Sequence, residues 1–399
     1  MLNNFSSFIR LRPVFAVAFL LCCNSLLFGI WVAAIPGIKD RLHLNDGTLG
    51  FSLLLSPLGA LTGVWLSGRL FGKMPVGKWM MIGYALVSVI MIAQINAINM
   101  IMFWMCLYLF GLISFLNGLS VNTTINMYEE KYARRFMSTS HALYSIGGGI
   151  SAGLATLFFS LGIRSAWQII IMTGCVFTIL FINRKYLLSH NEIIHTRSGL
   201  RLPSRSVLSI AFICMVVFMA EGCVADWSAI YLKETLHAPR QLIPLGYAGF
   251  AVAMTIGRLN GDQLITKFGS KNIVVAGSVL AATGFLVVVV SPFVIPVIIG
   301  YILVGFGCCC IVPVLFSASG KIPNVNAIEG YAMVTTGGLI GFLAGPSIIG
   351  FISEKADLAT ALSLLILLPA LTAFIAWKNN LLENKKLTGT IAEYDEQIY

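Results

Sequence analysis

Residues 207–231 read VLSIAFICMVVFMAEGCVADWSAIY, an apolar run of 25 residues that contains two carboxylates, Glu221 and Asp226. A helix rises about 1.5 Å per residue, so such a run can cross the hydrocarbon core of a bilayer, which is about 30 Å thick. Similar runs recur along all 399 residues, of which 58% are hydrophobic and only 11% charged. This composition is typical of a protein whose surroundings are mostly lipid.

The runs predict an all-α integral membrane protein with twelve transmembrane helices. We expect the spans near residues 13–36, 48–70, 79–97, 101–125, 138–161, 166–184, 207–231, 243–265, 272–290, 294–317, 330–352 and 358–377. With twelve spans, both termini lie on one side of the membrane. The positive-inside rule makes that side cytoplasmic, because it then carries all but six of the 26 Lys and Arg residues.

The basic residues and the cysteines indicate no further partner. The net charge of +10 comes from Lys and Arg dispersed over short loops, so we interpret them as determinants of topology and expect no nucleic acid partner. All nine Cys fall within predicted spans, where we expect no disulfide. Cys308, Cys309 and Cys310 point about 100° apart on a helix, which favours packing over a metal site. We expect no cofactor and no metal.

The longest polar interruption, residues 184–206, divides the chain into six spans plus six. It is basic and contains Gly and Pro, as linkers between helical bundles do. We therefore expect an N-terminal six-helix bundle over 1–183, a cytoplasmic linker over 184–206, a C-terminal six-helix bundle over 207–378 and a cytoplasmic tail over 379–399. The halves also echo each other, because Gly68-Arg69-Leu70 recurs as Gly257-Arg258-Leu259 late in the eighth span.

These two Gly-and-basic segments resemble the signature loops of the major facilitator superfamily. The second segment keeps an acid at Asp262, whereas the first has Lys73 at the matching place, which argues against a symmetrical charge gate. Further strings look like the YbjJ-like branch of bacterial members: Glu221-Gly222, Asp226-Trp227, His141 with Tyr144, Ser145 and Gly147, and Gly345-Pro346. The resemblance implies two six-helix bundles that rock about a central site, in a bacterial cytoplasmic (inner) membrane.

Glu221 and Asp226 are the candidate proton-coupling residues. An ionisable group inside a span costs about 3 kcal/mol on insertion scales, so it normally faces the bundle interior or water. Glu221 is expected roughly 21 Å from the cytoplasmic end of its span, where a carboxyl can load and unload a proton. The alternative is a permanently neutral Glu that bonds a neighbouring helix. Asp226, nearer the outer surface, would line the outer mouth, cap a helix turn or anchor at the interface.

In the resembled fold, spans 1, 4, 7 and 10 line the cavity, and span 11 flanks it. The candidate substrate-binding residues on these spans are Asn24, Phe28, Trp31, Tyr108, Asn117, Trp227, Tyr301 and Thr335. For each Asn, the alternative role is to join two helices. Candidate gating residues are Arg258 and Asp262, which are four residues apart and suited to a local ion pair, and His141, which can titrate near neutral pH.

We expect no Lys or Arg near the centre of a span, with Arg258 towards an inner helix end. A central site without a fixed cation favours a neutral or cationic substrate over an anionic one. The prediction is a secondary transporter, not an enzyme, that moves a small neutral organic solute, sugar-like or another metabolite, coupled to protons or sodium, and acts as a monomer. The alternatives are proton-antiport efflux of lipophilic or cationic drugs, and a non-transporting membrane receptor.

Overall fold

The computed structural model describes residues 8, 10–71, 73–132, 136–190, 207–319 and 327–382. This part of the chain is helical and contains no strand, which confirms the predicted all-α class. Eleven of its helices are long and apolar enough to cross a membrane. The twelfth, α10 (Leu245–Phe268), carries Arg258, Asp262 and Lys267, which make it less apolar than the others.

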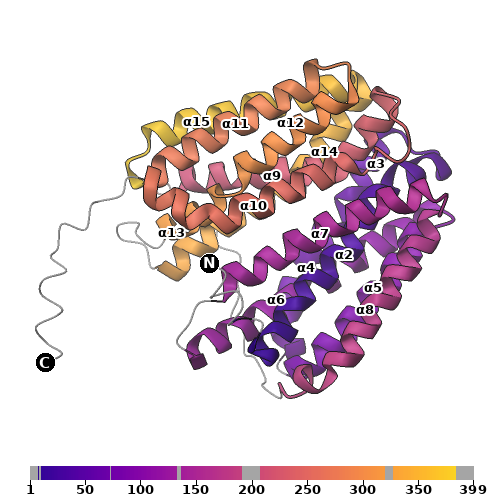
Figure 1. Ribbon diagram of the computed structural model, residues 1–399, viewed down its shortest axis with the longest axis vertical. Helices are drawn as coiled ribbons and strands as arrows, with labels where there is room; N and C mark the ends of the chain where they lie inside the picture. Colours follow the sequence, from indigo (N-terminus) through magenta and orange to yellow (C-terminus); the bar gives the residue numbers. More distant parts are fainter. Residues whose placement is uncertain are drawn as a thin grey trace, which may run out of the picture.

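Two groups of helices form the molecule (Figure 1). The first group consists of α2 (Arg12–Arg41), α3 (Asp46–Leu53), α4 (Leu55–Phe71), α5 (Val76–Ile95), α6 (Met100–Tyr132), α7 (Met137–Ser160) and α8 (Ser165–Leu187). The second consists of α9 (Leu208–Ile230), a π-helical turn (Tyr231–Thr235), α10, α11 (Ser270–Val290), α12 (Val294–Cys308), α13 (Ile311–Ser319), α14 (Ala327–Lys355), α15 (Leu358–Lys378) and a short turn, Asn380–Leu382.

The helices differ from the predicted spans in their continuity and in their length. Two spans are broken: the second between α3 and α4, and the tenth between α12 and α13, at Cys309 and Cys310. Several helices are longer than expected: α2 continues to Arg41, α6 to Tyr132, α10 to Phe268, and α8 to Leu187, beyond the predicted start of the linker. Residues 191–206 of that linker and residues 383–399 of the predicted tail lie outside the described residues.

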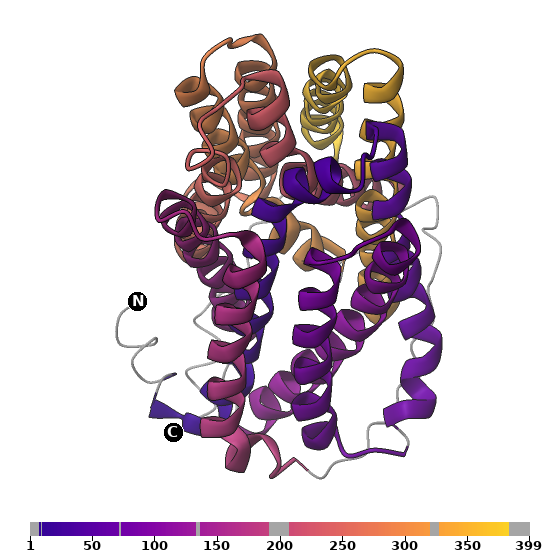
Figure 2. The ribbon, with the colours of Figure 1, turned by 90° about the vertical axis from the view of Figure 1, so that its right-hand side faces the viewer.

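The two bundles touch mainly where α7 meets α10, α3 meets α14 and α2 meets α9, with smaller contacts of α4 with α14 and α2 with α10. We call the end that carries residues 42–45 and 356–357 the outer end, following the topology prediction, and the opposite end the inner end. The bundles lie close together near the outer end and diverge towards the inner end (Figure 1). In Figure 2 the indigo-violet segment of the first bundle reaches the helices of the second at the outer end.

Glycines allow α3 and α14 to approach at the outer end. A Cβ added to Gly350 would stand 2.8 Å from Gly50 Cα and 3.0 Å from Trp227 Cζ2, which leaves no room for a side chain. The Ser347 hydroxyl donates a hydrogen bond of 2.8 Å to the Gly50 carbonyl beside this contact. Small residues at a helix crossing are the usual means of close packing in membranes.

Replacing Gly350 by Val is therefore expected to separate α3 from α14 and to destabilise the closed outer end. Overpacking of this kind costs about 1–3 kcal/mol. The thermal unfolding midpoint of the purified protein in detergent should fall for Gly350→Val. Gly153→Val is the matched control, because a Cβ there meets nothing within 4 Å. Equal midpoints for the two variants would contradict this assignment of the contact.

Candidate functional site

Lys39 joins the two bundles at the outer end. Its ammonium lies 2.5 Å from a carboxylate oxygen of Asp46 in the first bundle and 2.5 Å from one of Glu234 in the second. Lys39 is 8% exposed and the Asp46 side chain 16%, so this pair is largely shielded from water, whereas the Glu234 side chain is 34% exposed. A buried cation between two carboxylates is held strongly, because removing it leaves uncompensated charge.

A second set of polar contacts surrounds this cation. Lys233 of the second bundle pairs with Asp40 of the first and donates a hydrogen bond of 3.3 Å to the Pro36 carbonyl. Glu354 at the end of α14 accepts hydrogen bonds from Asn45 Nδ2 at 2.9 Å and from the backbone of Gly47 at 3.3 Å. Ser353 donates to Asp46. The outer end is thus closed by charges from both bundles.

These contacts come from an internal repeat. Lys39-Asp40-Arg41-Leu42-His43 ends α2, and Lys233-Glu234-Thr235-Leu236-His237 ends the corresponding helix of the second bundle. Each Lys pairs with the acid of the other copy, which is the pattern expected of two halves related by a two-fold axis. Both His residues have positive φ, 52° and 48°, the left-handed conformation common just after helices.

Glu221 and Arg258 form an ion pair deep in the second bundle. The Arg258 Nη2 atom lies 3.5 Å from Glu221 Oε1, and their side chains are 24% and 16% exposed. Glu221 is thirteen residues from the start of α9, and Arg258 is thirteen from the start and ten from the end of α10. At about 1.5 Å per residue, both lie near the middle of their helices.

This position corrects the expectation that the centre holds no fixed cation. The predicted eighth span ended at residue 265, whereas α10 continues to Phe268 and places Arg258 near its middle. Arg258 pairs with Glu221 on the neighbouring helix, whereas its expected pair with Asp262 stays a prediction. The side chain of Asp262, its predicted partner, lies outside the described residues. The central site therefore contains a carboxylate, Glu221, and a guanidinium, Arg258.

The first bundle also contributes to this site. The Arg258 guanidinium donates a hydrogen bond of 3.1 Å to the Ser145 hydroxyl on α7, and it interacts electrostatically with His141, one turn before Ser145. His141 is exposed, whereas Ser145 is buried. Arg258 thus links the acid of one bundle to a hydroxyl of the other.

Tyr247 extends the site towards the outer end. Its hydroxyl lies beside Gly148 of α7 and interacts electrostatically with Glu221, Arg258 and Asp226. The ring of Phe28, on α2, stands edge-on to it with centroids 6.1 Å apart. Of the predicted substrate-binding residues, Phe28 is therefore brought to the site. Asp226 lies on α9, five residues from Glu221 towards the outer end, and is partly buried.

Three predicted substrate-binding residues of the first bundle pack within it instead. Trp31 is 2% exposed and its ring packs against Phe103, 6.0 Å away. The Tyr108 hydroxyl donates a hydrogen bond of 2.8 Å to Thr62 Oγ1. Asn117 is buried, and its amide oxygen fills the space beside Gly83. The structure therefore gives these residues contacts between helices of one bundle.

Two predicted residues of the second bundle are also buried. Trp227 is fully buried and donates a hydrogen bond of 2.9 Å to the Pro346 carbonyl, which joins α9 to α14. Tyr301 is 1% exposed on α12 and packs against Gly246. Asn24 is partly buried on α2, with an oxygen that has no hydrogen bond within the described residues, and Thr335 is exposed on α14.

Sequence reasoning missed the outer charges and Tyr247. The repeated Lys-acid-x-Leu-His string was visible in the sequence and marks equivalent positions in the two halves. Tyr247 carried no comparable signal, because a single Tyr near a helix start is ordinary. Ser145 and Tyr144 appeared only as part of a family resemblance, without a role.

Replacing Lys39 by Met should open the outer end, because Asp46 and Glu234 would then repel each other without a cation. Breaking a buried pair costs about 3–5 kcal/mol, and less here because Glu234 is partly exposed. Spin labels at exposed positions Ile98 and Gln241, with Cys175 replaced by Ser, should show a longer distance between the bundles.

Lys378→Met, at an exposed inner position, is the control and should leave that distance unchanged. Adding Glu234→Gln to Lys39→Met removes one unpaired carboxylate and should shorten the distance again. If Lys39→Met gives the parent's distance, Lys39 does not hold the outer end closed.

Comparison with known proteins agrees with this architecture. The sequence profile of the Major Facilitator Superfamily matches residues 210–393. An uncharacterized MFS-type transporter of Yersinia pestis is 31% identical over 338 residues, which cover 85% of this chain and 88% of that protein. Membrane protein MosC of Rhizobium meliloti is 28% identical over 369 residues, covering 90% and 88%.

Solved structures show the same fold. A D-xylose-proton symporter superposes with a TM-score of 0.68 at 15% identity, over 92% of this chain and 97% of that one. The nucleoside transporter NupG superposes with a TM-score of 0.67 at 14% identity, over 92% and 98%. From the relative in Yersinia pestis and the shared fold, this chain belongs to the major facilitator superfamily of transporters.

Proposed function

We propose that this transporter moves a small neutral organic solute, sugar-like or another metabolite, by alternating access coupled to protons. It works as a monomer in a bacterial inner membrane, with both termini cytoplasmic, and belongs to the YbjJ-like branch. The observation that carries the proposal is the ion pair of Glu221 and Arg258 near the middle of the membrane, linked to Ser145 of the other bundle.

The charge of this pair selects the class of solute. Ionised Glu221 and Arg258 together carry no net charge, so neither a lipophilic cation nor an anion gains a net electrostatic attraction at this pair. A neutral solute with hydroxyl groups instead finds donors on Arg258 and an acceptor on Glu221 Oε1, which has no hydrogen bond within the described residues. The pair therefore favours a polar neutral solute over efflux of cationic drugs.

The names of two fold neighbours specify a nucleoside and D-xylose. They establish that this fold accommodates solutes of that kind in other proteins. The choice for this chain rests on its own charges. Phe28 and Tyr247, with rings from opposite bundles, supply apolar surface on which a sugar or base can lie.

A proton on Glu221 changes the contact between the bundles. The neutral acid no longer attracts Arg258, so among the described residues the guanidinium keeps its hydrogen bond to Ser145 and is free to bind a solute. Because Ser145 belongs to the first bundle and Glu221 to the second, the proton and the solute act on the same interbundle contact. Coupling requires this, because the proton and the solute then both shift the same equilibrium between the two arrangements of the bundles.

The charges at the outer end complete the cycle. The Lys39 and Lys233 pairs close that end in this structure, so the outward-facing state requires them to separate. Rocking of the bundles would break these pairs as the inner ends approach. The site of Glu221 and Arg258 lies between the two ends and is exposed to one side at a time.

Glu221→Gln should abolish uphill accumulation while retaining exchange. Gln keeps the size and hydrogen-bonding capacity of Glu, so the solute can still bind and move down its gradient. Because Gln cannot take up or release a proton, that movement is no longer coupled to protons. Reconstituted vesicles with an internal pH dye, tested first with D-xylose and uridine, would report solute-dependent proton entry for the parent and none for the variant. Counterflow of labelled solute should persist in both.

Asp357→Asn is the control for this experiment, because that carboxylate caps α15 at the outer surface through Thr360. It should accumulate solute as the parent does. Accumulation by Glu221→Gln equal to that of the parent would overturn the coupling role of Glu221. If a sodium gradient drives accumulation by the parent and a proton gradient does not, the coupling ion is sodium. Solute binding without accumulation by the parent would favour a receptor.

Arg258→Gln should also lose coupling, for the opposite reason. Without the cation, Glu221 retains its proton in the apolar interior, because an isolated carboxylate there is costly. We expect counterflow with no proton movement at neutral pH, and recovery of proton movement only as the pH is raised. A variant with the parent's pH profile would show that Arg258 does not control Glu221.

A further inference from the structure

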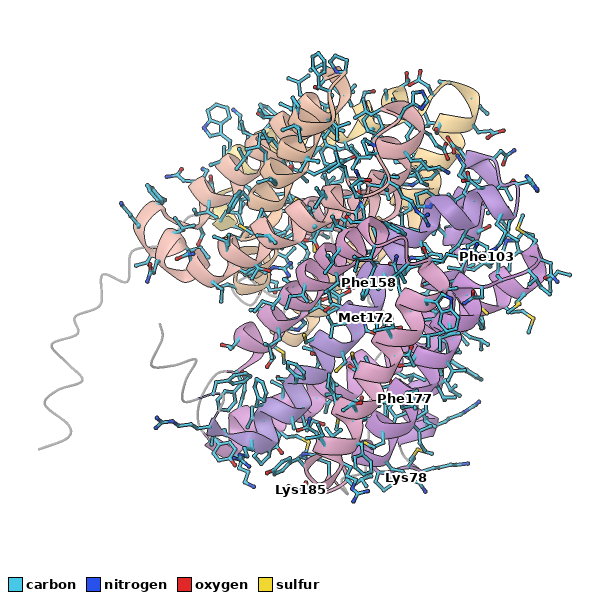
Figure 3. All side chains as sticks on the ribbon, turned by 45° about the vertical axis from the view of Figure 1, so that its right-hand side comes forward. Lys78, Phe103, Phe158, Met172, Phe177 and Lys185 are labelled. Carbon is cyan, nitrogen blue, oxygen red and sulfur yellow. The ribbon has the colours of Figure 1, made fainter. Side chains whose placement is uncertain are left out.

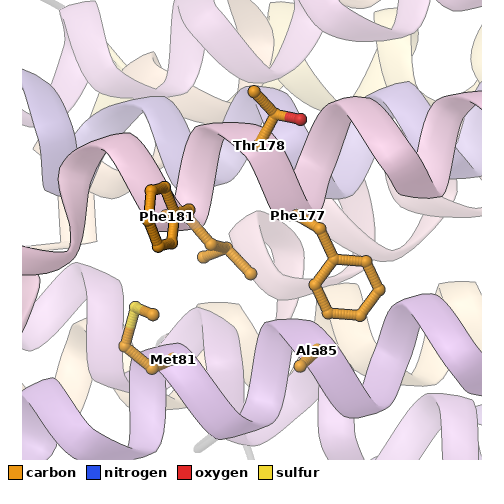
Figure 4. Close-up of a pocket in the computed structure, with 6 residues that line it drawn as sticks. Met81, Ala85, Phe177, Thr178 and Phe181 are labelled. Carbon is orange, nitrogen blue, oxygen red and sulfur yellow. The ribbon is translucent and has the colours of Figure 1, made fainter.

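A groove of about 490 Å³ lies on the first bundle, between α5 and α8 (Figure 4). Its walls are Met81 and Ala85 on α5 and Phe177, Thr178, Leu180 and Phe181 on α8. The hydroxyl of Thr178 is already bonded to the Gly174 carbonyl of its own helix, so the lining offers almost no free polarity. An apolar chain, and not a polar solute, matches this surface.

The groove faces away from the transport site. Helices α5 and α8 lie at the side of the first bundle that is remote from the second bundle (Figure 1). Phe177 is 41% and Phe181 62% exposed, and the neighbouring Ile82 and Leu86 are exposed as well. Apolar side chains exposed on a transmembrane helix meet lipid, so a lipid acyl chain is the molecule that reaches this groove.

Three cations stand at the inner mouth of the groove. Lys78 precedes Met81 by three residues on α5, and Arg184 and Lys185 follow Phe181 by three and four residues on α8. The Arg184 guanidinium lies 4.4 Å from the centre of the Phe181 ring, so it stands directly at the groove's wall. Figure 3 shows Lys78 and Lys185 at the same end of the molecule.

The two helix ends are fixed relative to each other. The backbone N–H of Gly77, next to Lys78, donates a hydrogen bond of 3.0 Å to the carbonyl of His190, just after α8. The groove and its cations extend roughly 10–12 Å along each helix, over seven residues from Lys78 to Ala85 and eight from Phe177 to Lys185. That length fits within one leaflet, about 15 Å deep.

The geometry points to a bound anionic phospholipid, with one acyl chain in the α5–α8 groove and its phosphate held by Lys78, Arg184 and Lys185. The three cations surround the headgroup from two helices, and the groove fixes the chain below it. Basic pockets between helices on the cytoplasmic side are suited to anionic headgroups. This lipid site is independent of the proposed solute and coupling mechanism.

Native mass spectrometry of the purified full chain tests the site with phosphatidylglycerol against phosphatidylcholine. The parent should retain phosphatidylglycerol preferentially. Combined Lys78→Gln, Arg184→Gln and Lys185→Gln should weaken its binding at least about tenfold, since each cation contributes severalfold. Ala85→Trp, which fills the groove without changing any charge, should weaken it as well.

The control removes three other inner-end cations: Arg69→Gln, Lys267→Gln and Lys378→Gln. Each of them stands over an aromatic ring, as Arg184 and Lys185 do, so the total charge removed is the same, but none borders this groove. An equal loss in this control, or parent-like binding by Ala85→Trp, would overturn the proposal in favour of general surface charge. If the parent is a dimer and Ala85→Trp is a monomer, a second copy of the chain and not a lipid occupies the groove.

Discussion

A charge in hydrocarbon needs a partner, and this constraint organises the centre of the molecule. A carboxylate or guanidinium at the middle of a spanning helix costs about 2.5–3.5 kcal/mol on insertion scales. Glu221 on α9 and Arg258 on α10 meet this requirement for each other. Because the partner of each is another mobile charge and not a fixed backbone group, a proton or a polar solute can exchange with it. The Glu221–Arg258 ion pair therefore lowers the cost of placing both charges in the membrane, and it can also be broken by a proton or a solute.

The outer end applies the same rule at the bundle interface. The repeated Lys-acid string places a cation and an anion at the end of each half, and each Lys pairs with the acid of the other copy. Under the proposed rocking of the bundles, these two equivalent pairs would form or break together. The Gly50–Gly350 contact permits this approach, because a side chain there would hold the helices apart. Both the central and the outer charges thus include contacts between the two bundles.

Sequence patterns predicted the twelve spans and the interior position of Glu221, because length and apolarity are local properties. They did not predict which way a side chain faces around its helix. Trp31, Trp227 and Tyr301 became core residues because packing between helices decides orientation. The depth of Arg258 was misjudged because α10 continues past the predicted end of its span, residue 265, to Phe268. Its pairing with Glu221 depends on how two helices cross, which no spacing in the sequence encodes.

The central claim is that Glu221 takes up a proton and thereby releases Arg258. Infrared difference spectroscopy of the parent against Glu221→Gln, recorded as the pH is lowered, would observe this carboxyl directly. The account predicts a protonated-carboxyl band that appears in the parent, shifts when solute is added and is missing from the variant. Identical difference spectra for the two proteins, over the pH range in which solute moves, would contradict it.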